Sequence, residues 1–223
     1  MRSLAMPNPE DVNLIIFDTD GTIIPSMKPV YEAIRRTFAK ANWEVSFTPE
    51  DIERYFGTTG GELYKFIAPE GKSWEEVREK AREEYAAAFR EFAVTYPGVK
   101  ETLEILRSRD YRLVLYSNAS TFYFDLVKSA LGIEAYFDYT ECLGENNLTK
   151  IELIQKIKDK FGGPEAAVVG DRIHDIEAAA ETGSLSVGAM YGYGKDEPEK
   201  ADIVINKFPD LLEIFDRRLT IFE

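Results

Sequence analysis

The sequence predicts an α/β protein in which a parallel sheet is interrupted by a helical insertion. Three observations support this fold class. An apolar run at residues 13–17 ends in a group of polar side chains, residues 23–93 show only helical periodicity, and helices alternate with short apolar strands after residue 96. Such alternation is typical of right-handed βα connections in a parallel sheet. We therefore expect a core domain formed by residues 1–25 and 95–223, with residues 26–94 inserted as a helical bundle.

The first strand is predicted at residues 13–17, after a short polar lead-in at residues 1–12. It contains Leu and Ile without alternating polar residues, which is the pattern of a strand covered on both faces. Ligands of such sheets bind at the carboxyl ends of the strands. Asp18 and Asp20 emerge at this end, where a coil can bring both carboxylates to one opening. The simpler alternative is an Asp-Gly turn with two solvated acids.

Four helices are expected in the insertion. The first begins after Ser26, and the second begins at the hydroxyl cap Thr48 and ends at Gly57. A short third helix follows the two glycines at 60–61. The fourth and longest begins at the capping box of residues 73–76 and carries an apolar stripe.

After residue 96, capping and glycine signals delimit the core elements. Gly132 ends one helix, and Thr149 with Glu152 forms a capping box that opens another. The pattern predicts helices at residues 99–107, 121–131, 149–161 and 173–181, and strands at residues 112–116, 137–140, 166–169, 185–190 and 201–205.

The amino-acid composition limits which kinds of molecule this protein is expected to bind. The 223 residues include 44% hydrophobic residues, so we expect a globular protein with a substantial core. The net charge of −13 disfavours nucleic acid and anionic membranes as partners. Cys142 is the single cysteine, which excludes an internal disulfide, and no segment is apolar enough to span a membrane. We expect a cytoplasmic protein, whose oligomeric state the sequence does not specify.

Polar side chains follow the other predicted strands as well. Ser117 and Asn118 follow the strand at 112–116, Lys150 lies at a helix start, and Asp171 and Asp175 follow the strand at 166–169. Each alone has a simpler explanation: a strand-to-loop turn, a solvated first-turn lysine, or acids that satisfy a helix dipole. Their occurrence in this order, directly after apolar strands, indicates one shared site.

These segments resemble the motifs of the haloacid dehalogenase-like superfamily. FDTDGT at 17–22 resembles its first motif, YSNAS at 116–120 its second, the isolated Lys150 its third, and GDRIHD at 170–175 its fourth. The resemblance spans nearly the whole chain and implies a Rossmann-like core with a helical cap at residues 26–94. Arg172 stands where the superfamily more often has a small hydroxyl residue; it is expected either to touch substrate or to bridge acids at the surface.

The residue types suggest a phosphoryl-transfer mechanism. A free aspartate has a pKa of about 3.9, so Asp18 is expected to be ionised and to attack phosphorus. Asp20 is the expected general acid and base. Ser117 and Asn118 are expected to donate hydrogen bonds to the phosphoryl group, Lys150 to supply positive charge, and Thr22 to take part in substrate binding.

Magnesium is the expected cofactor, because an anionic nucleophile and an anionic phosphate need a cation between them. Its expected ligands are Asp18, the main-chain carbonyl of Asp20, and Asp171. Asp175 lies one helical turn beyond Asp171 and is assigned to the same metal site, either directly or through water.

Other candidates are given smaller roles. The loop of residues 57–61 either ends a helix or contacts substrate, which makes Thr58 and Thr59 candidates for substrate binding. Gly21 is the expected hinge. His174 is expected to point away from the acids, Cys142 to be a buried thiol, and the aromatic residues of 111–139 to pack in the core.

The expected function is a magnesium-dependent phosphatase that hydrolyses a small phosphomonoester through an aspartyl phosphate, similar to phosphoglycolate phosphatases. A phosphomutase, a phosphonate hydrolase or a non-catalytic phosphate-binding protein are the alternatives. Dehalogenation is disfavoured, since Asp20 and the metal-site acids would have no purpose in it.

Overall fold

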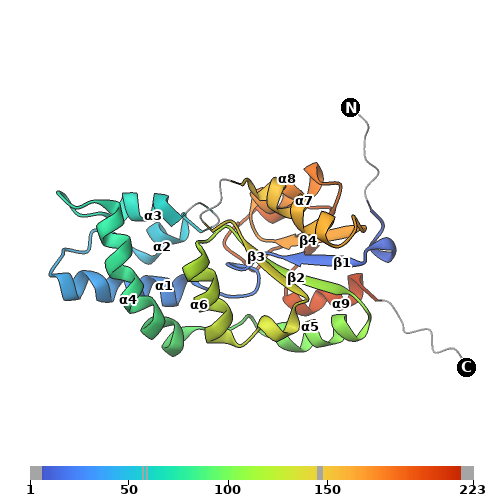
Figure 1. Ribbon diagram of the computed structural model, residues 1–223, viewed down its shortest axis with the longest axis horizontal. Coiled ribbons are helices and arrows are strands. Elements are labelled where there is room, and N and C mark those ends of the chain that lie inside the picture. Colours follow the sequence, from blue (N-terminus) through green and yellow to red (C-terminus); the bar gives the residue numbers. More distant parts are fainter. Residues whose placement is uncertain (1–6, 57, 59, 145–147, 217–223) are drawn as a thin grey trace, which may run out of the picture.

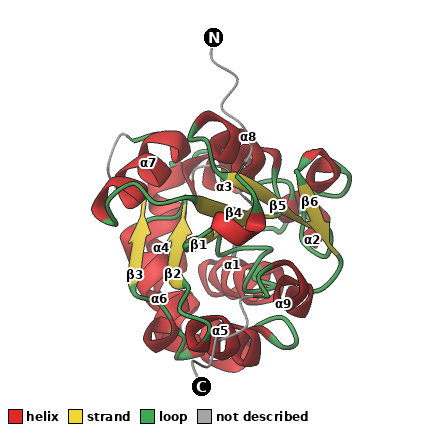
Figure 2. Ribbon diagram, turned by 90° about the vertical axis from the view of Figure 1, so that its right-hand side faces the viewer, coloured by secondary structure: helices red, strands yellow, loops and turns green. Residues whose placement is uncertain are grey.

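The computed structural model describes residues 7–56, 58, 60–144 and 148–216, and it confirms the α/β fold class. Six parallel strands form one sheet in the order β3-β2-β1-β4-β5-β6, with β1 in the centre (Figure 2). Their bounds are β1 Leu14–Phe17, β2 Arg112–Ser117, β3 Tyr139–Cys142, β4 Ala166–Gly170, β5 Leu185–Ala189 and β6 Ile203–Ile205.

Helices cover both faces of this sheet (Figure 1). Alternate side chains of β1 point in opposite directions: Ile15 and Phe17 belong to one buried cluster, Leu14 and Ile16 to another, and all four are inaccessible to solvent. The second cluster includes residues of α7 and α8. The core helices are α5 Val99–Ser108, α6 Thr121–Leu131, α7 Lys150–Lys160, α8 Ile173–Glu181 and α9 Leu211–Ile214.

The four remaining described helices lie beside the carboxyl ends of the strands (Figure 1). They are α1 Met27–Ala41, α2 Pro49–Glu53, α3 Gly60–Ile67 and α4 Trp74–Phe92. The ring of Phe38 on α1 is fully buried and meets the rings of Trp43 and Phe47 edge to face, at centroid distances of 5.4 and 5.0 Å. The division into a core of residues 1–25 and 95–223 and an insertion of residues 26–94 stays a prediction.

The boundaries of the predicted elements agree with the observed ones to within a few residues, while α9 was not predicted. Two boundary differences have a local cause. The second insertion helix ends at Glu53 instead of reaching Gly57, because the amides of Tyr55 and Phe56 bond to carbonyls three residues back and tighten the chain into turns. Gly57 itself lies outside the described residues. The strand predicted at 137–140 begins at Tyr139, because residues Glu134–Tyr136 form a 3₁₀ turn.

Ser26 precedes α1, yet its side chain forms no capping hydrogen bond to that helix. Thr149, in contrast, forms the expected reciprocal capping box with Glu152 at the start of α7. None of the helices in the described ranges combines the length and the hydropathy that crossing a bilayer requires.

Phe38→Ala tests whether residues 26–94 unfold as a unit. Removing a fully buried ring should lower stability by about 3–5 kcal/mol. Both tryptophans, Trp43 and Trp74, lie in this segment, so tryptophan fluorescence in urea reports on it alone. For Phe38→Ala we expect the fluorescence transition to move to lower urea than the far-ultraviolet circular dichroism transition.

The matched control is Phe208→Ala, which removes an equally buried ring from the core. It should move the circular dichroism transition instead. Coincident transitions in both variants would contradict the predicted division.

Candidate active site

The chain turns back sharply after β1 and holds Asp18 and Asp20 at the sheet edge. The amide of Asp18 still bonds to the β4 carbonyl of Val169 at 2.9 Å, and the Thr19 hydroxyl donates to the Tyr116 carbonyl at 2.7 Å. Gly21 has φ +82°, and a Cβ atom there would collide with the carboxylate of Asp171. Glycine is therefore needed at this position for both conformation and space.

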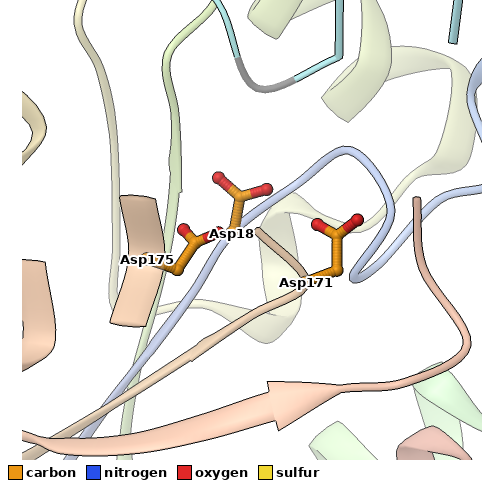
Figure 3. A group of neighbouring side chains, drawn as sticks. All are labelled: Asp18, Asp171 and Asp175. Carbon is orange, nitrogen blue, oxygen red and sulfur yellow. The ribbon is translucent and has the colours of Figure 1, made fainter. Parts of the chain in front are cut away.

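Three carboxylates meet at this edge (Figure 3). Asp18 follows β1, Asp171 follows β4 and Asp175 lies in the first turn of α8; one oxygen from each lies within 4.8 Å of the others. All three are buried. The ammonium group of Lys150, at the first position of α7, lies 3.2 Å from Asp18 and 2.5 Å from Asp175. The fold thus brings together four residues predicted from three separate motifs.

Asp171 has a buried oxygen that faces this cluster. Its Oδ2 accepts a hydrogen bond from the Tyr193 amide at 2.6 Å, but Oδ1 receives none from the described residues. Burial, with the nearby charge of Asp175, raises the pKa of Asp171 to about 7. A hard divalent cation would neutralise such a group, so the donor set of Asp18, Asp171 and Asp175 fits a metal ion.

The charges around Asp18 correct the expectation about its ionisation. From its residue type alone, Asp18 was expected to be ionised with an ordinary pKa. Burial raises the pKa of Asp18 well above its usual range; Lys150 opposes this shift, while Asp175, Asp171 and Asp20 add to it. One lysine does not compensate burial and three neighbouring carboxylates, so full ionisation of Asp18 needs a further cation.

The side chain of Asp20 lies apart from the three clustered carboxylates and has its own partner. The Tyr123 hydroxyl, from α6, donates to Asp20 at 2.7 Å. Burial raises the pKa of Asp20, and the hydroxyls of Ser26 and Tyr123 lower it. The assignment of the Asp20 main-chain carbonyl to the metal stays a prediction.

A cavity of about 590 Å³ opens above the acids. Asp18, Asp20, Ser117 and Asn118 line it, and Thr58 approaches it from the insertion. The Ser117 hydroxyl accepts a hydrogen bond from the Ala119 amide at 3.1 Å, which orients it.

Of the other predicted substrate-binding residues, Thr22 is not among the described residues that line the cavity. Thr22 is fully buried, and its carbonyl accepts a hydrogen bond from the Tyr191 hydroxyl. Thr59 lies outside the described residues.

Two tyrosines were missed by the sequence reasoning. The rings of Tyr116 and Tyr123 do pack in the core, as expected of the aromatic residues of 111–139, but their hydroxyls bond to Asp175 and Asp20. Tyr116 carried a usable signal, since it directly precedes Ser117 at the end of a strand. The predictions that His174 is exposed and that Cys142 is buried are confirmed.

Comparison with known proteins identifies the family. Residues 15–189 match the family model described as haloacid dehalogenase-like hydrolase. The chain belongs to the haloacid dehalogenase-like hydrolase family. The resemblance inferred from the four motifs is thereby confirmed.

Relatives of this hydrolase include enzymes with different names. It is 26% identical to a phosphoglycolate phosphatase of Aquifex aeolicus, over 95% of this chain and 100% of that protein. It is also 26% identical to the pyrophosphatase PpaX of Listeria welshimeri, over 91% of this chain and 96% of that protein. The crystal structure of a predicted phosphoglycolate phosphatase from Haemophilus somnus shares the fold, with a TM-score of 0.80, 24% identity and coverage of 92% and 98%.

Arg172 joins the insertion to the sheet in this hydrolase. Its guanidinium donates to the Phe56 carbonyl in the insertion and to Glu197, at 3.0 Å, in the loop after β5. The Phe56 ring stacks on Tyr193 with centroids 4.7 Å apart, and the Tyr193 hydroxyl accepts a hydrogen bond from the Met27 amide. Among the described residues, the Arg172 guanidinium therefore contacts one acid, Glu197, and one main-chain carbonyl, so it does not bridge two acids as one of its expected roles required, and its contact with substrate stays a prediction.

Asp171→Asn tests metal binding without an activity assay. A ligand at a hundred times its dissociation constant stabilises the folded state by about 2.7 kcal/mol, so saturating Mg²⁺ should raise the melting temperature of the wild type by several degrees. We expect Asp171→Asn to lose most of this increase. Glu177→Gln, an exposed acid on the same helix, should keep it. An unchanged response in Asp171→Asn would exclude Asp171 as a ligand.

Arg172→Ala tests the contact between the insertion and the sheet. Charge-assisted hydrogen bonds contribute about 1.5–3 kcal/mol, so their loss should favour opening of the insertion. We expect faster hydrogen exchange at residues 49–56, measured by mass spectrometry, and a KM raised about tenfold. His174→Ala, two residues away and exposed, is the control. Exchange rates equal to those of the wild type would contradict this role.

Proposed function

We propose that this hydrolase is a magnesium-dependent phosphatase that acts on a small phosphomonoester, in the manner of phosphoglycolate phosphatases. The observation that carries the proposal is the convergence of Asp18, Asp171 and Asp175 beside Lys150, where Asp18 also lines the cavity. The names of the relatives support hydrolysis of phosphate esters or anhydrides. Phosphoglycolate is the first substrate to test.

In the first step, an oxygen of Asp18 attacks phosphorus, and the bond between phosphorus and the leaving oxygen breaks. Asp20 donates its proton to that oxygen. Burial raises the pKa of Asp20, which favours the protonated form needed here. The product is an aspartyl phosphate on Asp18 and a free alcohol.

In the second step, water attacks the phosphorus of the aspartyl phosphate while Asp20 accepts the proton of that water. Inorganic phosphate leaves, and Asp18 regains its carboxylate. The hydrogen bond from Tyr123 holds Asp20 in place during both steps. Lys150, Ser117 and the Asn118 amide are the proposed donors to the phosphoryl oxygens.

Asp18, Asp171 and Asp175 are the side chains proposed to hold Mg²⁺, with the Asp20 carbonyl as a further ligand. When bound, the ion supplies positive charge that offsets repulsion between the nucleophile and the phosphate. Asp175 also accepts hydrogen bonds from Tyr116 and Lys150, which fix its orientation.

Residues 26–94 are proposed to act as a cap over a core of residues 1–25 and 95–223. Thr58 lines the cavity from the cap side, which supports a role in substrate contact. Gly21, with its left-handed conformation beside Asp171, is the proposed hinge. Thr59 remains a proposed contact to substrate, whereas the full burial of Thr22 leaves its predicted contact without support. The lone cysteine is consistent with a reducing compartment, and we propose the cytoplasm.

Asp18→Asn tests the nucleophile. Release of phosphate from p-nitrophenyl phosphate and from phosphoglycolate, with and without Mg²⁺, should fall at least about a thousandfold, because an amide does not attack phosphorus. Circular dichroism should stay unchanged. Asp125→Asn, an exposed acid on α6, should retain full activity.

Two results would contradict the proposal. One is substantial turnover by Asp18→Asn, and the other is a wild type that releases no phosphate from a broad panel of phosphate esters with Mg²⁺. Analysis of products by phosphorus NMR separates a phosphatase from a phosphomutase, which would yield an isomer in place of inorganic phosphate.

A further inference from the structure

The cavity at Asp18 is lined by side chains of both charges. Asp18 and Asp20 line it together with Ser117 and Asn118. Its cationic lining, within the described residues, comes from Arg78 and Arg82 of α4. The proposed reaction uses neither arginine. Two cations that face the cavity on a protein of net charge −13 need a separate explanation.

The spacing of residues on α4 places the arginines away from the reacting groups. Arg78, Arg82 and Tyr85 share one face of the helix, since residues three or four apart are neighbours. The Tyr85 ring contacts that of Tyr123, with centroids 5.9 Å apart, and Tyr123 donates to Asp20. With a rise of 1.5 Å per residue, Arg82 and Arg78 lie about 4.5 and 10 Å from Tyr85 along the helix axis.

Local contacts leave the two guanidinium groups available to a ligand. Arg82 stacks on the cavity residue Phe122 at 4.4 Å, and its ion pair with Glu79, at 3.2 Å, is open to solvent on both sides and therefore weak. Arg78 lies 5.0 Å from the Trp74 ring, and no described acid is within ion-pair distance of it. A stacked guanidinium keeps its N–H edge free for a carboxylate or phosphate.

The positive charges of Arg78 and Arg82 act on Tyr64 in the wall of the cavity. Tyr64 lines the cavity and donates a hydrogen bond to Tyr85 at 2.9 Å. Burial raises the pKa of Tyr64, while Arg78 and Arg82 both lower it. α4 as a whole contains more Glu than Arg and Lys, so the positive charge on this face is local.

We propose that Arg78 and Arg82 form a specificity subsite for a second anionic group on the leaving group of the substrate, several bonds from the phosphate that is hydrolysed. This inference rests on the proposed phosphatase function and leaves its chemistry unchanged. A cavity of about 590 Å³ is large enough for such an extended molecule. A carboxylate and a phosphate share the required chemistry, and matched substrates distinguish them.

The test compares two pairs of substrates. 6-Phosphogluconate and sorbitol 6-phosphate are open chains that differ in a terminal carboxylate, and fructose 1,6-bisphosphate and fructose 6-phosphate differ in a second phosphate. The wild type should have the higher kcat/KM for the charged member of at least one pair. Arg78→Gln/Arg82→Gln should reduce that preference about tenfold or more, because the charge-assisted hydrogen bonds are lost.

Control variants distinguish an effect of the subsite from an effect of the net charge of the protein. Lys80→Gln/Arg90→Gln makes the same change in charge on the same helix, at residues that do not line the cavity, and should keep the wild-type preference. Arg78→Lys/Arg82→Lys keeps the charge and should retain part of it. Circular dichroism checks the folding of each variant.

The proposed function and this inference fail separately. A wild type that releases no phosphate from p-nitrophenyl phosphate contradicts the phosphatase proposal. In that case the subsite is tested by calorimetry, which compares the affinity of the wild type for the two members of each substrate pair. The inference is overturned by absence of any preference for the charged members, in rate or in binding, or by a preference that survives in Arg78→Gln/Arg82→Gln.

Discussion

Burial of several carboxylates beside a single lysine is the constraint on which this site depends. Asp18, Asp171 and Asp175 are almost inaccessible to solvent, and Lys150 contacts two of them. Burying like charges together costs free energy unless positive charge is supplied. The same unfavourable burial raises the pKa values of Asp18 and Asp171. The rigid sheet imposes this arrangement, because the ends of β1 and β4 are fixed by their mutual pairing.

The sequence predicted those parts of the structure that depend on local patterns. The helices at 121–131 and 173–181 have the predicted bounds. The Ser120 hydroxyl caps the start of the first and Gly132 ends it, and Gly183 closely follows the end of the second. The common edge of Asp18, Ser117 and Asp171 was also predictable, because each residue lies at or just after the end of an apolar strand and parallel strands end together.

Contacts between distant segments were beyond the reach of sequence patterns. The hydrogen bond from Tyr123 to Asp20 joins residues 103 apart, and that from Arg172 to Phe56 joins residues 116 apart. No periodic pattern in the sequence marks either contact, because each depends on how α6 and the insertion pack against the sheet. The raised pKa of Asp18 was missed for the same reason: it reflects burial among neighbours that are remote in sequence.

Tyr193 makes three contacts, one each through its backbone amide, its hydroxyl and its ring. Its amide donates to Asp171, its hydroxyl accepts from Met27 at the start of the insertion, and its ring stacks on Phe56. Any swing of the insertion that separates Phe56 from this ring also pulls on the backbone that steadies Asp171. A substitution at Tyr193 would therefore disturb two places at once, the packing of Phe56 and the surroundings of the Asp171 carboxylate.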